Sequence, residues 1–281
     1  MLRTTSLSAP LKSLLRSKIS SIFNDVARGE APVVRQEGGL FGSGSVAWRV
    51  HGDVTSMMVG GVASLLMQML HPSVLAGVWD HSNFRSDMHG RLRRTARFIA
   101  MTTYGTRHEA ESVIDRVRTI HGHVKGHLPD GTPYVADDPS LLAWVHITET
   151  TSFLDAWIRY SEPLMSLADQ DRYFAETAVV GEALGAHELP RSRAATMALI
   201  EAMRPQLQVD DRTREVARLI LSARSPGLVG EAPRILTMQA GIDLLPRWAR
   251  DMHGLSVPNL GIPIVRAGTL GIAQALRWAF S

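Results

Sequence analysis

The chain contains no cysteine among its 281 residues. This absence excludes disulfides, thiol nucleophiles, iron–sulfur clusters and structural zinc sites of the cysteine type. The compartment is left open, because a chain without thiols is tolerated in any redox environment. Cofactor or metal ligands must therefore come from histidine or other non-thiol side chains.

Several sequence motifs of common enzymes are also absent. H-E-x-x-H, E-x-x-H and D-x-x-H do not occur, which argues against zinc proteases and ferritin-like di-iron sites. G-x-S-x-G is missing, so a nucleophile-elbow hydrolase is unsupported. The formal charge is only +3, and no dense Lys/Arg tract carries interleaved aromatics, so we expect no nucleic acid partner. Gly42 to Ala47 fits G-x-G-x-x-A, but no strand precedes it and no helical pattern follows, so we interpret it as a flexible connection.

Apolar residues recur mainly at helical spacing, without internal repeats or strand alternation. We therefore predict an all-α fold: a basic amphipathic helix and loop over 1–44, then one multi-helix domain over 45–281. Asp53 and Asp138 precede helical patterns as N-caps, and His127–Asp137 is turn-rich. The apolar 54–70 pattern is at the lower length limit for a membrane span, yet Gln68 and its polar flanks favour a core helix. Further helices are predicted over 166–186, 191–203, 212–222, 233–252 with a break near Pro246, and 264–280.

Residues 90–126 form the most informative stretch, because two helical patterns meet there at a Tyr-Gly-Thr break. Arg91 and Thr95 lie four residues apart and share one helix face. In the second pattern His121 falls within an apolar stripe, whereas His123 points away at about 100° per residue. A guanidinium and a hydroxyl facing an inward imidazole could form a cofactor site. The same pattern also fits a hydrogen-bonded core histidine beside a solvated basic face.

Three ordered blocks resemble the oxygenase family that includes the latex-clearing rubber oxygenases and the MpaB-type oxygenases. The resemblance covers residues 45 to 250 and rests on Gln68-x-x-His71-Pro72 with His81-Ser82-x-Phe84, Arg91-Leu-x-Arg94-Thr95 with His121-x-x-Val124-x-Gly126, and Gly131-x-x-Tyr134 with Trp144-Val145-His146. It implies helices packed around a haem-sized pocket, and the arrangement is globin-like in that sense. It also implies haem b, with His121 as the proximal iron ligand and Arg91 and Thr95 near the haem.

The chain departs from the rubber oxygenases at two positions. Arg94 stands where a lysine can act as a distal ligand, and a guanidinium is a poor iron ligand. No glutamate lies between Glu37 and Glu109 to match the family's catalytic base. Cleavage of polyisoprene is therefore not expected. The resemblance instead favours a haem b-dependent oxygenase that uses dioxygen or peroxide on a small apolar, lipid- or isoprenoid-like substrate, with Arg91 and Thr95 as catalytic residues and Arg94 beside the cofactor.

Other hypotheses remain open at this point. His71 and His146 are alternative iron ligands, and His71, His81 and His89 would be the ligands of a zinc hydrolase. A cofactor-free lipid-binding or membrane-peripheral protein is suggested by the acid-free segments 1–23 and 255–281. The N-terminal helix could also pack on the body of the protein. We expect a cytoplasmic protein, with peripheral membrane contact through its termini as the open question.

Overall fold

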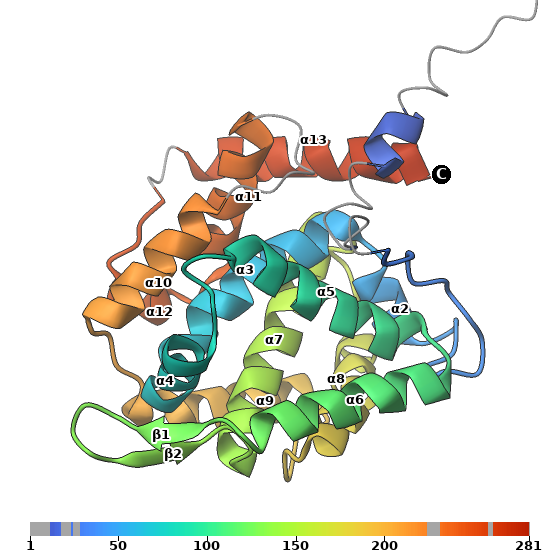
Figure 1. The fold of residues 1–281 in the computed structure, drawn as a ribbon. Coiled ribbons are helices and arrows are strands. Elements are labelled where there is room, and N and C mark those ends of the chain that lie inside the picture. The colour runs from blue at the N-terminus through green and yellow to red at the C-terminus, as the bar shows by residue number, and fades with distance from the viewer. Residues whose placement is uncertain (1–11, 18–23, 25–28, 224–230, 258–260, 281) are drawn as a thin grey trace, which may run out of the picture.

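Helix α7 (Pro139–Tyr160) lies in the middle of the computed structural model, which describes residues 12–17, 24, 29–223, 231–257 and 261–280 (Figure 1). Its first turn is capped as predicted, since the Asp138 carboxylate accepts from the Ser140 and Leu141 amides and Pro139 occupies N1. Trp144, Ile147 and Leu154 are fully buried along it. The other helices are arranged around α7.

Helix α3 (Val54–Gln68) packs along α7 more extensively than any other element and begins at the predicted N-cap, Asp53. Gly60 permits this approach: a Cβ there would lie 2.8 Å from the Ser152 carbonyl oxygen. Gly60 is therefore required for the close approach of α3 to α7. At Gly61 a Cβ would meet only the Phe153 ring edge at 4.0 Å, so that glycine is not required by packing.

The remaining described elements confirm an all-α architecture with one small hairpin. They are α2 (Val46–His51), α4 (Pro72–His81), α5 (Met88–Tyr104), α6 (Arg107–His121), β1 (Lys125–His127), β2 (Pro133–Val135), α8 (Leu167–Leu184), α9 (Arg193–Met203), η2 (Arg204–Gln206), α10 (Asp211–Ser222), α11 (Glu231–Leu244), α12 (Arg247–His253) and α13 (Ile262–Phe280).

The structure corrects the expected loop over 127–137, because β1 and β2 pair there as an antiparallel hairpin with Gly126 opposite Tyr134. Its turn uses Gly131 at φ +88°, a conformation that glycine adopts without strain. Strands of three residues are too short to show an alternating pattern. Tyr134 anchors the hairpin on α4, where its hydroxyl donates to Asp80 at 2.6 Å.

Two further helices lie outside the residue ranges predicted as helices. Residues 72–81, where loop and short helix were both left open, form the short helix α4, which Pro72 starts at its first position. Residues 46–51 form α2, so a helix does follow Gly42-Ser-Gly44. The Ala47 amide at its start donates to the Glu176 carboxylate at 2.9 Å, which fills the place where a phosphate would bind. Helix α2 therefore gives no support to nucleotide binding by the Gly42 to Ala47 motif.

Helix α13 lies across α11 and α3 and buries Val265, Ala273 and Leu276 (Figure 1). Its two arginines form ion pairs with buried aspartates. Arg266 donates to Asp243 at 2.7 Å, and Arg277 donates to Asp53 at 2.7 Å. The basic edge seen in the sequence is therefore turned toward internal carboxylates.

Residues 12–17 are helical and contact the end of α13. The Lys12 ammonium lies 5.0 Å from the Trp278 ring, and Arg16 donates to the Ala279 carbonyl. The rest of the predicted amphipathic segment 1–23 lies outside the described residues. Within the described part of the chain, no single helix is long and apolar enough to cross a membrane; α3 and α4 pass that test only together, across a 104° bend.

Candidate functional site

The α5–α6 helical hairpin brings Arg91 and His121 together. Arg91 lies 14 residues before Gly105 and His121 lies 16 residues after it, so the two antiparallel helices place them at the same end. Thr106 fixes the turn, because its hydroxyl accepts from the Glu109 amide while the Glu109 carboxylate accepts from the Thr106 amide. Local capping thus sets the position of the site.

His121 is the last residue of α6, and its Nδ1 is buried without a hydrogen-bond partner in the structure. Burial lowers its pKa, and the nearby Arg91 guanidinium lowers it further, while Asp137 acts in the opposite direction. The ring is therefore neutral at pH 7 and carries an unused nitrogen in a sheltered place. His123 lies beyond the helix end, exposed, with Nδ1 2.6 Å from the Thr119 carbonyl oxygen.

Arg91 is half-buried, and its only hydrogen bond among the described residues goes to the Ser82 hydroxyl at 3.0 Å. Burial and the charge of Arg94 lower its pKa. In the described part of the chain no carboxylate pairs with it. A sheltered guanidinium without a counter-charge favours binding of an anionic group.

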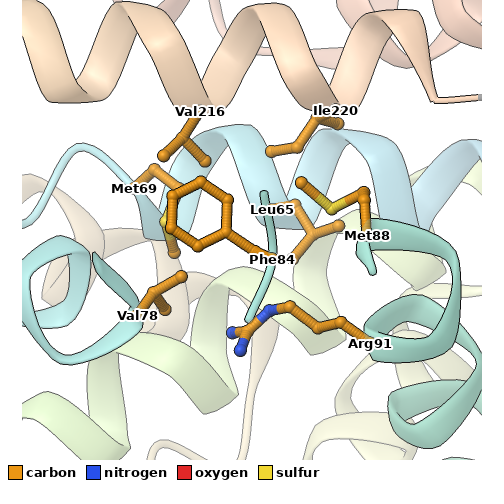
Figure 2. A pocket seen from close by; sticks show the side chains of 8 residues that line it. All are labelled: Leu65, Met69, Val78, Phe84, Met88, Arg91, Val216 and Ile220. Carbon is orange, nitrogen blue, oxygen red and sulfur yellow. The ribbon is translucent and has the colours of Figure 1, made fainter. Parts of the chain in front are cut away.

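A small cavity of about 10 Å³, room for about one water molecule, lies beside the Arg91 side chain. Figure 2 shows Arg91 extending from α5 toward Val78, below Phe84. The other side chains that line it are apolar: Leu65, Met69, Met88, Val216 and Ile220. Arg91 thus supplies a cation to an apolar wall, whereas His121 interacts with Arg91 electrostatically but does not line this cavity.

The structure does not bring Thr95 and Arg94 into this cavity. Thr95 is exposed, and its hydroxyl donates back to the Arg91 carbonyl at 3.3 Å. Arg94 is also exposed and donates to Asp87 and Asn83, each at 3.3 Å. Both side chains lie on the outer side of α5, although Arg91 and Thr95 are one turn apart.

The three histidines of the zinc hypothesis are separated. His71 is buried before α4 with Nε2 3.4 Å from Gln206, whereas His81 is exposed with Nε2 3.1 Å from the Lys125 carbonyl oxygen. His89 lies in the first turn of α5. Within the described residues, no group of three or more histidine, aspartate or glutamate side chains could hold a metal ion.

A second polar cluster lies between α2, α5, α7 and α8. His51 bonds through Nδ1 to the Thr103 hydroxyl at 2.8 Å and through Nε2 to the Tyr173 hydroxyl at 2.9 Å. His146 interacts electrostatically with His51, and Glu149 with Tyr173. Of these residues, only His146 was predicted from the sequence as a candidate site residue. The spacing His146-x-x-Glu149, which places two polar groups on one face of a buried helix, is the signal that could have shown them.

Burial shifts the pKa values in this cluster toward the neutral forms. It lowers the pKa of His51 to about 3 and of His146 to about 4, and it raises that of Glu149 to about 7. All three side chains are half-buried by surface area, and the shifts show the direction in which desolvation acts on each.

Glu149→Gln should make the protein more stable at pH 8 by on the order of 2 to 3 kcal/mol, with little effect near pH 4. The raised pKa means that the folded state holds the Glu149 proton more tightly than the unfolded state. Stability is therefore lost as pH rises from the unfolded-state pKa through about 7, and glutamine removes that loss. Urea unfolding at pH 4, 6 and 8 measures it.

The control for this experiment is Glu111→Gln, since Glu111 is exposed on α6 and only pairs with Arg107 at 3.8 Å. That change should shift stability by no more than about 0.5 kcal/mol at any pH. If the Glu149 variant gains nothing between pH 4 and pH 8, the Glu149 carboxylate does not lie in a desolvated place.

Residues 48–278 match the family described as "ER-bound oxygenase mpaB/B'/Rubber oxygenase, catalytic domain". The chain belongs to this family. Comparison with curated proteins and with solved structures gives no match. Membership of the mpaB/rubber oxygenase family supports an oxygenase, and hence an enzyme. The matched range includes Arg91, His121 and the His51–Glu149 cluster.

The donors of the Arg91–His121 site fit the haem that was expected for this family. An iron porphyrin needs an unprotonated nitrogen, a cation for its carboxylates and apolar walls. His121 Nδ1 supplies the nitrogen, and Arg91 supplies the cation within an apolar wall, although His121 does not line that cavity. The cavity beside Arg91, at about 10 Å³, is far smaller than the roughly 300–1,000 Å³ of typical ligand pockets. Haem binding therefore requires the elements around Arg91 and His121 to move apart.

Proposed function

We propose that this protein is a haem b-dependent oxygenase that acts on a small apolar, lipid- or isoprenoid-like substrate. The observation that carries the proposal is the buried, partner-free Nδ1 of His121 next to the Arg91 guanidinium. Buried polar atoms are almost always hydrogen-bonded, so an orphan imidazole nitrogen points to an external ligand. His71 also has a buried Nδ1 without a partner, but no uncompensated cation is described beside it.

In this proposal His121 holds the haem iron through its neutral ring, and Arg91 binds a carboxylate of the porphyrin or another negative charge at the site. Bound haem would supply the activation of dioxygen or peroxide. The apolar side chains of Leu65, Phe84 and Met88 exclude water from the cavity. Thr95 would orient a bound group only after giving up its bond to the Arg91 carbonyl, and Arg94 would act from the surface.

The polar cluster of His51, His146 and Glu149 can handle a proton. Glu149 has a pKa near neutral, and the Glu149 carboxylate makes no hydrogen bond or ion pair within the described residues. Such a group can accept or release a proton at physiological pH. In the proposed reaction it would take the place of the upstream glutamate that rubber oxygenases use and this chain lacks.

The test is the absorption spectrum of the full chain, purified after expression with iron and a haem precursor. We expect a Soret band and about one haem per chain, because one described site has both a free imidazole nitrogen and an unpaired guanidinium. A colourless protein that takes up no added haemin would refute haem dependence. It would then favour the cofactor-free binder.

A further inference from the structure

A second and larger cavity, of about 220 Å³, lies between α3, α7, α9 and the α11–α12 turn. This volume is somewhat below the roughly 300–1,000 Å³ of drug-sized ligand sites and suits a smaller molecule. Its walls are mainly apolar: Ala63, Met67, Met197, Ile200, Leu244, Leu245, Pro246 and Trp248. No lysine, arginine or histidine lines it.

The polar groups of this cavity are acceptors. The Thr148 hydroxyl donates to the Trp144 carbonyl at 2.7 Å, and that of Ser152 donates to the Thr148 carbonyl at 2.7 Å. Their protons are thus used within α7, and their oxygens can only accept from a ligand. The Thr151 hydroxyl oxygen, in contrast, is buried and has no partner. A buried hydroxyl in the wall of a cavity is a place for a ligand hydroxyl to bind.

Two carboxylates at the cavity set its preference for charge. Asp155 is paired with Arg193 at 2.6 Å and Glu201 with Arg204 at 2.7 Å. Because both are already compensated, they attract a cation only weakly. They still disfavour an anion, since no basic side chain lines the cavity to receive it.

This cavity is separate from the polar cluster of His51, His146 and Glu149. At about 100° per residue, Thr148, Thr151 and Ser152 lie on one side of α7, and His146 and Glu149 lie on another. The cavity also shares no lining residue with the one beside Arg91.

We infer that this cavity binds a neutral amphipathic molecule, an aliphatic alcohol in chemical class, whose hydroxyl meets Thr151 and whose chain lies against Met67, Met197 and Trp248. The apolar wall provides the burial of the chain. The hydroxyl oxygens of Thr148 and Ser152 and the unpartnered hydroxyl of Thr151 recognise the hydroxyl group of the ligand. The inference does not depend on haem binding.

The experiment is isothermal titration of the full chain with octanol, octanoate and octylamine. Octanol should bind one molecule per chain, at least about tenfold more tightly than octanoate. Octanoate binding as tightly would overturn the inference. If octylamine binds more tightly than octanol, the carboxylates attract a cation and the assignment to an alcohol is wrong.

Two variants locate the site. Met197→Trp should fill the cavity and abolish octanol binding, and Thr151→Val should weaken it about five- to tenfold, the value of one hydrogen bond. Thr151→Val is nearly isosteric, so it keeps the test informative if the tryptophan variant fails to fold. Leu164→Ala, at an almost fully exposed position, is the control and should leave binding unchanged.

His121→Ala separates this inference from the proposed function. It should leave octanol binding unchanged, because His121 does not line the cavity. Loss of octanol binding in that variant, or unchanged binding in both cavity variants, would show that the alcohol binds elsewhere.

Discussion

His121→Ala should remove the Soret band from the purified protein and weaken haemin binding by at least about a hundredfold. Outer-shell partners of metal ligands alone are worth about 10- to 100-fold in metal affinity, so loss of the ligand itself should cost at least as much. The Nδ1 of His121 has no partner among the described residues, so its removal breaks no hydrogen bond described there. The variant should therefore fold normally, with an unchanged urea midpoint before haem is added.

Added imidazole should restore part of the Soret absorption in the His121→Ala protein, because a free imidazole can occupy the space that the side chain leaves. His123→Ala is the matched control: it removes an exposed imidazole two residues away that only meets the Thr119 carbonyl. That variant should keep its haem.

Two outcomes would contradict the assignment of His121. If the His121→Ala protein binds haemin with the affinity and spectrum of the wild type, the iron ligand is another residue. His71→Ala and His146→Ala then identify it, because these are the alternative ligands. Should all three variants keep the band, histidine ligation at these positions is wrong.

Asp243→Ala should lower the free energy of unfolding by about 3–5 kcal/mol. The Asp243 side chain is 2 % exposed and accepts from Arg159 on α7 at 3.0 Å and from Arg266 on α13 at 2.7 Å. Without it, two guanidinium groups face each other across the α7–α13 contact with no counter-charge in the described structure. Urea unfolding of the variant at pH 7 measures the loss.

The control is the exposed pair Arg247–Asp251 within α12, whose atoms are 3.7 Å apart. Asp251→Ala should change stability by no more than about 1 kcal/mol, because exposed ion pairs are worth little. An Asp243→Ala protein with the urea midpoint of this control would show that the two arginines find water or other partners. The ion pair between Asp243 and Arg266 would then not stabilise the packing of α13 on the core.

Local chemistry made much of the fold predictable from the sequence. The N-caps Asp53 and Asp138, and the break at Gly105, depend on residues within one or two helical turns. The apolar stripe of the second central helix also placed His121 at its inner edge. The helix ends at His121, however, so the helical angle used for His123 does not apply, although His123 is exposed.

Other features depend on contacts between residues far apart in the chain. The sequence showed an acid-free C-terminal helix but not that Arg266 and Arg277 meet Asp243 and Asp53, because nothing local specifies such partners. The short hairpin escaped prediction, since three-residue strands carry no usable period.

The sequence by itself determined the family, the helical architecture and the pairing of Arg91 with His121, since these rest on ordered motifs, periodicity and distance from one turn. Tertiary structure alone decided that the His121 Nδ1 is buried without a partner among the described residues, that Thr95 is exposed, and that burial raises the pKa of Glu149. The physical reason is that burial and desolvation depend on which helices pack together, and that is set by the whole chain.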